Sequence, residues 1–314
     1  MDADSSPEAL FRKNSRSFSL AARFFAARDQ LDVARMYRFC RYLDDLADDT
    51  HAGDHQALDR AKRRLVGEMT APASSIEADF LALAEERAIP IEPALELIAA
   101  LLEDCGARFL KDQDQLICFA YGVAGTVGLM MQHVIDARDA EARPFAIDLG
   151  IGLQLSNVVR DIAEDARRGR FYLPEEWVKP ERILRALEGE RSAITEVDQA
   201  VERVLDLSER YYESARKGFS SIPNRNRRVI FIATALYQGI GKKVARCAPG
   251  GWHQRAILSR LEKFILIVRS LLEYRTWSIQ QWTRHPRPVH DATLHRPLFA
   301  KYLSRLEPTT SDLP

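Results

Sequence analysis

Apolar side chains recur every three or four residues along most of the chain, with polar side chains between them. This is the period of amphipathic α-helices, and no segment shows the strict alternation of a half-buried β-strand. The pattern predicts seven long helices, over residues 30–53, 93–110, 114–135, 145–169, 194–219, 225–245 and 256–282. No linker separates blocks of different composition. We therefore predict one all-α domain over residues 1–290, followed by an irregular C-terminal tail over 291–314.

Composition excludes some classes of function. The 314 residues, 46% of them hydrophobic, are enough to bury a large core. The chain has 45 lysines and arginines against 45 aspartates and glutamates, so its charge gives no indication of nucleic-acid binding. Cys40, Cys105, Cys118 and Cys247 are scattered through apolar patterns, as expected for buried thiols in a reducing compartment. With no secretory signal at the start, these features predict a cytoplasmic protein.

One segment has nearly the length and composition of a membrane span. No charged residue occurs from Leu116 to Ile135. Gln132 and His133 interrupt the segment, however, and three glycines lower its hydrophobicity. We therefore expect a buried central helix, with peripheral contact with a membrane left open.

Four carboxylates crowd the C-terminal end of the helix predicted over residues 30–53. Asp44 and Asp48 are four residues apart, so a helix places them on one face, and Asp45 and Asp49 repeat this spacing. The helix dipole disfavours negative charge at this end. Either a bound cation offsets the repulsion or the carboxylates form a solvated acidic helix end.

A second column of oxygen ligands favours the cation. Asn157, Asp161 and Asp165 follow one another at intervals of four residues, with Gln154 one turn earlier. Hard oxygen ligands suit Mg²⁺, which also binds phosphate oxygens, whereas zinc would prefer His and Cys. Two such helices facing each other predict a group of Mg²⁺ ions between them, with a diphosphate as the bridging ligand.

Arginines accompany both acidic columns. Arg41 precedes the first column, Arg160 lies within the second, and Arg167, Arg168 and Arg170 follow it. Guanidinium groups match phosphate oxygens, but they also form ion pairs one helical turn away from aspartates. The hydroxyls of Ser15, Ser17 and Ser19 precede an apolar helix, where they either cap the helix or bind an anion.

The segments DDLAD, YGVAGTVGLMM and QLSNVVRDIAEDARRGRFYLP together resemble the squalene/phytoene synthases, the head-to-head trans-prenyltransferases. The resemblance runs from about Ser15 to about Arg255 and is nearest to the bacterial phytoene synthases. It implies the isoprenoid synthase fold, with helices surrounding a central apolar cavity. By position in its motifs, it assigns two sets of residues. The metal ligands are Asp44, Asp48, Asn157, Asp161 and Asp165, and the substrate-binding residues are Ser15, Ser17, Arg41, Gln154, Arg160, Tyr237 and Arg255.

The resemblance also implies a reaction. Two geranylgeranyl diphosphates condense through a cyclopropylcarbinyl diphosphate, and proton loss yields phytoene. The metal is Mg²⁺, with Mn²⁺ as an alternative, and NADPH is not expected. One alternative is a squalene or dehydrosqualene synthase acting on farnesyl diphosphate. The other is a non-catalytic assembly factor on the same fold. The resemblance does not predict the oligomeric state.

This chain departs from the family pattern at two positions. Phe119 stands where the family usually has a tyrosine, so the second half-reaction is expected to use Tyr121 or another group. Asn14 occupies a position often held by His or Gly. Gly122, Gly125 and Gly128 lie on one predicted helix, and two interpretations of them stay open. The glycines either let a prenyl chain approach a cavity wall or allow close packing between helices.

Overall fold

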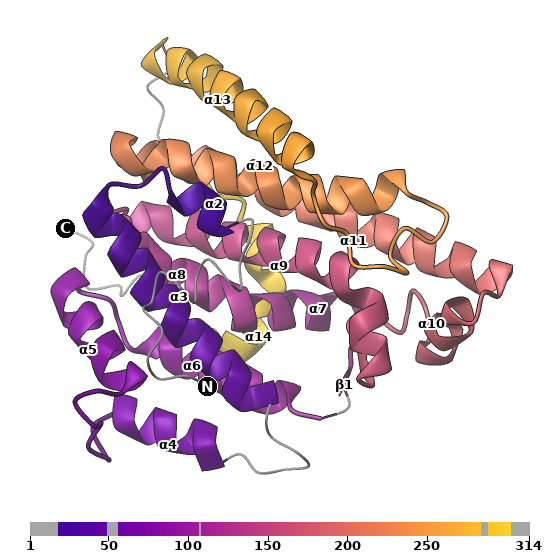
Figure 1. Ribbon diagram of the computed structural model, residues 1–314, viewed down its shortest axis with the longest axis horizontal. Coiled ribbons are helices and arrows are strands. Elements are labelled where there is room, and N and C mark those ends of the chain that lie inside the picture. Colours follow the sequence, from indigo (N-terminus) through magenta and orange to yellow (C-terminus); the bar gives the residue numbers. More distant parts are fainter. Residues whose placement is uncertain (1–17, 49–55, 107, 284–287, 303–314) are drawn as a thin grey trace.

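The computed structural model describes residues 18–48, 56–106, 108–283 and 288–302, and most of these are helical (Figure 1). The longest helices are α3 (Ala27–Asp48), α9 (Arg143–Arg167), α11 (Arg191–Lys217), α12 (Asn224–Arg246) and α13 (Arg260–Thr283). Shorter helices lie between them: α2 (Phe18–Ala22), α4 (Gln56–Leu65), α5 (Ile76–Arg87), α6 (Glu92–Asp104), α7 (Gln113–Ala120), α8 (Thr126–Val134), α10 (Pro180–Leu187) and α14 (Arg296–Tyr302). The prediction of an all-α fold is confirmed.

Each of the seven predicted helices is present, and the patterning missed several short ones. The helix predicted over 93–110 ends earlier, at Asp104, because Gly106 adopts a positive φ of 92° that breaks the helical backbone. The sequence analysis did not predict α4, α5 or α10, which have 12 residues or fewer. Short amphipathic helices depend on tertiary contacts more than on their own pattern.

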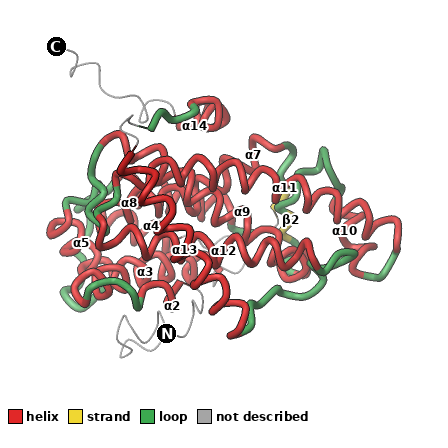
Figure 2. The backbone as a smooth tube through the Cα atoms, turned by 90° about the horizontal axis from the view of Figure 1, so that it is seen from above, coloured by secondary structure: helices red, strands yellow, loops and turns green. Residues whose placement is uncertain are grey.

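Helix α9 lies at the centre of the protein. It packs against α8, α11 and α12, and Figures 1 and 2 both show it enclosed by neighbouring helices. The uncharged segment forms α7, a π-helical turn η1 (Tyr121–Gly125) and α8, which pack against α6 and α9. Together they make one helix, Gln113–Val134, that is long and apolar enough to cross a membrane, and 61% of its apolar window is buried in the protein. The structure thus places this segment in the core, as predicted.

Gly122 and Gly128 of this helix allow close packing between helices. A Cβ at Gly122 would lie 2.6 Å from the Cβ of Ala100, and one at Gly128 would lie 2.2 Å from the carbonyl oxygen of Ala146. A Cβ at Gly150 on α9 would likewise lie 2.2 Å from the carbonyl oxygen of Ala124. Close helix packing therefore accounts for Gly122, and both interpretations hold for Gly128, which also lines an apolar cavity.

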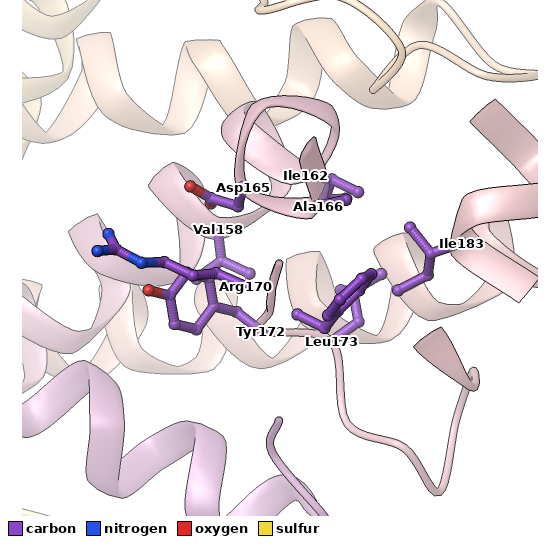
Figure 3. Close-up of a pocket in the computed structure, with 9 residues that line it drawn as sticks. Val158, Ile162, Asp165, Ala166, Arg170, Tyr172, Leu173 and Ile183 are labelled. Carbon is purple, nitrogen blue, oxygen red and sulfur yellow. The ribbon is translucent and has the colours of Figure 1, made fainter. Parts of the chain in front are cut away.

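The turn after α9 is held by a short pair of parallel strands, β1 (Arg108–Phe109) and β2 (Arg170–Phe171). The chain enters β2 through Gly169, whose φ of 74° lies in the left-handed region that favours glycine. Apolar residues Ile162, Leu173 and Ile183 gather on one side of this turn (Figure 3). The turn is thereby fixed against the end of α9.

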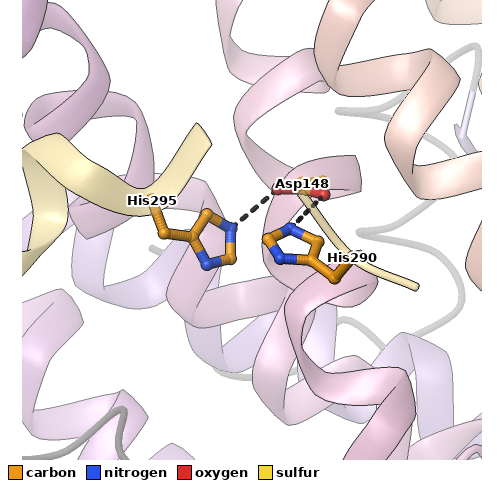
Figure 4. Close-up of side chains that lie close together, drawn as sticks. All are labelled: Asp148, His290 and His295. Atoms are coloured by element: carbon orange, nitrogen blue, oxygen red, sulfur yellow. Dashed lines mark hydrogen bonds and ion pairs between the residues drawn. The ribbon is translucent and has the colours of Figure 1, made fainter. Parts of the chain in front are cut away.

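The C-terminal segment corrects the prediction of an irregular tail. Residues 292–302 form a 3₁₀ turn, η4 (Ala292–His295), followed by α14, which packs against α7. A fully buried carboxylate on α9, Asp148, accepts hydrogen bonds from the Nε2 atoms of His290 (3.0 Å) and His295 (2.8 Å), as Figure 4 shows. Residues 303–314 lie outside the described residues, so the remainder of the tail stays a prediction.

The environment of Asp148 explains why this contact holds the tail. Burial alone would raise the pKa of the Asp148 carboxyl, but the hydrogen bonds from the two imidazoles, together with the charge of His295 and the nearby hydroxyl of Ser214, bring this pKa below its ordinary value. Asp148 is therefore ionised at neutral pH. Each carboxylate oxygen is matched with one imidazole nitrogen, so hydrogen bonding alone accounts for the cluster. Residues 290–302, which the hydrophobic periodicity did not predict to be ordered, are therefore held in place by contacts with a distant part of the chain.

Candidate active site

The two acid-bearing segments converge on one polar cavity of about 260 Å³. The first segment, on α3, contributes Arg41 and Asp44, and the second, on α9, contributes the column that begins at Gln154. The residues of α9 that line the cavity are Gln154, Asn157, Val158, Arg160, Asp161 and Asp165. The facing arrangement predicted from the sequence is therefore present in the structure.

Some predicted residues cannot be placed. Ser15 and Ser17 lie outside the described residues, and so does Asn14. Asp48 is the last residue of α3, and its side chain lies outside the described part of the structure. The roles assigned to these residues stay predictions.

Asn157 has an unused hydrogen-bond acceptor. Its side-chain nitrogen donates to Oε1 of Gln154 at 3.2 Å, which orients the amide along α9. Its Oδ1 is buried and accepts no hydrogen bond from any residue that the structure describes. A buried polar atom without a partner carries a free-energy penalty, so this oxygen is suited to a ligand such as a cation.

Two guanidinium groups neutralise Asp161. Arg160 pairs with it through both carboxylate oxygens, and the Nε atom of Arg255 lies 3.2 Å from its Oδ1. Arg255 also reaches Glu164 at 3.1 Å, so its half-exposed side chain lies beside this cluster. Its role in substrate binding stays a prediction. Arg41 pairs instead with Asp45, at 2.5 Å. The site therefore holds arginines close to the carboxylates, where they could also meet a diphosphate.

Burial and neighbouring charges shift the pKa of Asp165. Burial, followed by repulsion from Asp161 and Glu164, raises this pKa from 3.8 to about 7. Arg170 opposes the shift without cancelling it. A cation bound to this carboxylate would oppose both causes of the shift and favour the ionised form.

The structure does not place Tyr121 at the site, contrary to the prediction. Its side chain is buried and does not line the polar cavity, and its hydroxyl donates to Oε2 of Glu96 on α6 at 2.6 Å. Residues two apart on a helix point in nearly opposite directions. Phe119 lines the polar cavity, so Tyr121 must face the other way.

Sequence reasoning missed Tyr172 and Asp104, which also line the cavity. The ring of Tyr172 stacks on that of Phe119 with 4.4 Å between centroids, and its hydroxyl donates to Oδ2 of Asp104 at 2.7 Å. Figure 3 shows the polar ends of Asp165, Arg170 and Tyr172 on the same side of the turn. A phenol is thus present beside Phe119, although it comes from a different segment. Tyr172 lies in the RGRFYLP stretch, which could have identified it, whereas no motif marks Asp104.

An apolar cavity of about 230 Å³ begins beside the polar one. Asp44, Gln154 and Asn157 border both, and Tyr237 lines the apolar one. Apart from the hydroxyls of Tyr37 and Thr234, the rest of its wall is largely apolar and comes mainly from α3, α8, α9 and α12. A smaller cavity of about 60 Å³ shares Gly128, Met131, Leu149 and Ile230 with it and continues toward Phe219. An elongated apolar molecule with an anionic head group would fit this arrangement.

Comparison with known proteins agrees with the geometry. Residues 11–262 match the family model described as squalene/phytoene synthase. The chain belongs to this family. Among its relatives, a 15-cis-phytoene synthase of Enterobacter agglomerans is 32% identical over 268 residues, covering 81% of this chain and 90% of its own length. A 15-cis-phytoene synthase of Pantoea ananas is 32% identical over 292 residues, covering 88% and 93%.

Solved structures show the same fold. A dehydrosqualene synthase in complex with ligand superposes with a TM-score of 0.74 at 24% identity, covering 86% of this chain and 95% of that one. A squalene synthase from Alicyclobacillus acidocaldarius gives a TM-score of 0.66 at 23% identity, covering 79% and 94%. This squalene/phytoene synthase family member therefore has the fold expected from the resemblance.

Proposed function

We propose that this protein condenses two prenyl diphosphates head to head, and that it converts two molecules of geranylgeranyl diphosphate into phytoene. The observation that carries the proposal is the acid-lined polar cavity that shares Asp44, Gln154 and Asn157 with an adjacent apolar one. The relatives named phytoene synthases support the C20 substrate. The apolar space that continues past Met131 and Leu149 is consistent with a long prenyl chain.

The polar cavity fits the Mg²⁺ on which members of this family typically depend. The ligands would be Asp44, Asn157, Asp161 and Asp165, together with Asp48 by position in the motif. The unpartnered Oδ1 of Asn157 favours a cation here, and a bound cation would favour the ionised form of Asp165. When bound, Mg²⁺, or Mn²⁺ in its place, would neutralise negative charge on a departing diphosphate.

The arginines would stabilise the leaving group, and the apolar walls would protect the cation from water. Arg160 and Arg255, now paired with Asp161, can turn toward diphosphate oxygens and stabilise the leaving group. Cleavage of the C–O bond leaves an allylic cation, which water would capture. The apolar walls of the second cavity exclude water while this cation joins the second substrate. Loss of a proton closes the cyclopropylcarbinyl diphosphate, and departure of its diphosphate then allows rearrangement to the C40 skeleton.

Loss of a proton, with no reductant, completes the synthesis of phytoene, so we propose that the enzyme needs no NADPH. Tyr172 is placed to assist this step, because its oxygen can accept a proton as its own proton passes to Asp104. Burial raises the pKa of Tyr172, so the phenol stays neutral at physiological pH. This residue would take the part that the tyrosine missing at position 119 plays in the family.

The first experiment incubates the purified protein with Mg²⁺ and either geranylgeranyl or farnesyl diphosphate, with and without NADPH. We expect phytoene from the C20 substrate without NADPH, and no product when EDTA removes the metal. Product formed from the C15 substrate alone would contradict the C20 assignment. No product from either substrate would favour the non-catalytic assembly factor.

A second experiment tests Tyr172. Replacing it with phenylalanine is expected to slow phytoene formation roughly 10- to 100-fold, because a positioned proton-transfer group is lost. The cyclopropylcarbinyl diphosphate should accumulate, as detected by chromatography of radiolabelled product. The double variant Y172F/F119Y returns a phenol to the stacked partner ring and should recover part of the rate. Undiminished phytoene formation by Y172F would exclude this role.

We also propose a cytoplasmic location. The four cysteines are free thiols in the structure, in keeping with a reducing compartment. They are less buried than predicted, because Cys40, Cys105 and Cys118 are partly buried and Cys247 is exposed.

A further inference from the structure

Helix α13 lies at the edge of the protein and leaves one long face uncovered. In Figure 1 it forms the outermost layer, and it packs on α12. Its inner face is well anchored: the rings of Tyr274 and Trp277 meet Phe231 of α12 at centroid distances of 5.4 and 5.5 Å. Leu266 fills the space above Gly239, where a Cβ would lie 2.4 Å from its Cδ1. These contacts hold the inner face of α13 against α12. They therefore determine which side chains of α13 point outward.

The uncovered face is apolar along most of its length. Large apolar side chains recur there at helical spacing, with exposed fractions between 40% and 67%. They are Leu261, Phe264, Ile265, Val268, Leu272 and Ile279. With Ile257 just before the helix, these make seven of the 13 large apolar side chains exposed among the described residues. Such a concentration on one surface indicates a binding face, since soluble surfaces scatter their exposed apolar residues.

The charges around this apolar face are basic. Arg260 and Arg269 lie along its two edges, and Arg275 lies within it between Leu272 and Ile279. The two acidic residues of α13 are engaged by bases, Glu262 with Lys243 of α12 at 2.8 Å and Glu273 with Arg269 at 3.4 Å. An apolar stripe edged with arginines is typical of helices that lie in the interface of an anionic membrane. Arginine stems can lie along the apolar region while their guanidinium groups reach phosphate.

We propose that the α13 face binds the surface of a bilayer containing anionic phospholipid, with the helix axis in the membrane plane. A second copy of the chain fits the face less well. An antiparallel pairing of two α13 helices centred on Val268 would set Arg260 of each copy beside Arg275 of the other, and like charges repel. The proposal depends on this surface alone and not on the proposed reaction.

The experiment uses flotation of the full-length protein with vesicles of phosphatidylcholine, alone or with phosphatidylglycerol. We expect the protein to float with the anionic vesicles, and L261Q/L272Q to reduce the partition coefficient at least tenfold. V66Q/L184Q is the matched control, because it makes the same chemical change at two exposed apolar residues on other elements. It should float like the wild type. R260Q/R275Q should lose the preference for anionic vesicles and float no better with them than with phosphatidylcholine alone.

Circular dichroism of each variant shows whether the fold is retained, which is expected because the substituted side chains are exposed. A wild-type protein that does not float with either kind of vesicle would refute the proposal. Equal binding by L261Q/L272Q would refute it as well. A wild-type dimer in sedimentation that L261Q/L272Q dissociates, without vesicle binding, would assign the face to a second copy instead. None of these readings requires turnover, so they are independent of the proposed function.

Discussion

Replacing Asp161 with asparagine is expected to lower turnover of geranylgeranyl diphosphate by about a thousandfold or more, because ionisation of a diphosphate depends on charge neutralisation. Asp161 lies in the middle of the α9 column, and two guanidinium groups meet at its carboxylate. The substitution keeps the shape of the side chain but removes the charge that holds both the metal and these arginines. Steady-state assays with radiolabelled substrate at saturating Mg²⁺ would measure the loss.

The matched control is Glu164→Gln, on the same helix. Glu164 makes ion pairs with Arg168 at 3.2 Å and with Arg255 at 3.1 Å, but it does not line the polar cavity. Because both ion pairs are exposed at the surface, we expect its loss to change turnover by no more than about threefold. If D161N retained wild-type turnover, the metal-ligand assignment would have to be abandoned. A similar loss in both variants would indicate a general effect of charge on α9.

Replacing Asp165 with asparagine is expected to stabilise the metal-free protein while it abolishes stabilisation by Mg²⁺. Burial and the neighbouring carboxylates raise the pKa of Asp165 from 3.8 to about 7, so the folded protein prefers the protonated form. The stability contributed by this preference is complete below pH 3.8 and is lost as pH rises through 7. At pH 8 the ionised carboxylate therefore destabilises the metal-free fold, and D165N should raise its free energy of unfolding by on the order of 2 kcal/mol.

Urea unfolding at pH 8 and pH 5.5, with and without Mg²⁺, measures both effects. The metal-free wild type should gain stability on acidification, and this part of the pH dependence should be absent from D165N. Mg²⁺ should stabilise the wild type more at pH 8 than at pH 5.5, because protons compete for the same carboxylate. Glu164→Gln again serves as the control and should retain the response to Mg²⁺. A D165N protein that Mg²⁺ still stabilises fully would remove Asp165 from the ligand set.

The second acidic column could be predicted closely because its geometry is local. Four-residue spacing alone sets Asn157, Asp161 and Asp165 on one face of a helix, and the structure shows all three lining the cavity. Asp44 followed from the same rule on α3. The sequence pattern does not show that the two acidic faces meet. We predicted it from chemistry, because carboxylates that repel one another on two separate helices can be offset by cations held between those helices.

The identity of the phenol at the site could not be predicted from the sequence. Position 121 was an attractive substitute for position 119 because the two are close in sequence, yet they point in opposite directions on the helix. Tyr172 enters the cavity only because β2 and the turn after α9 bring a distant segment against Phe119. Asp104 arrives in the same way, from the end of α6.

By itself, the sequence determined the helical class, the long helices and the acidic faces of α3 and α9, since each depends on residues within a few turns of one another. Only the tertiary structure decided which side chains complete the cavity, that the glycines at 122 and 128 let neighbouring helices touch, and that His290 and His295 fix the C-terminal segment on Asp148. It also decided which face of α13 stays uncovered. These features depend on contacts between residues far apart in the chain, and periodicity contains no information about which distant surfaces meet.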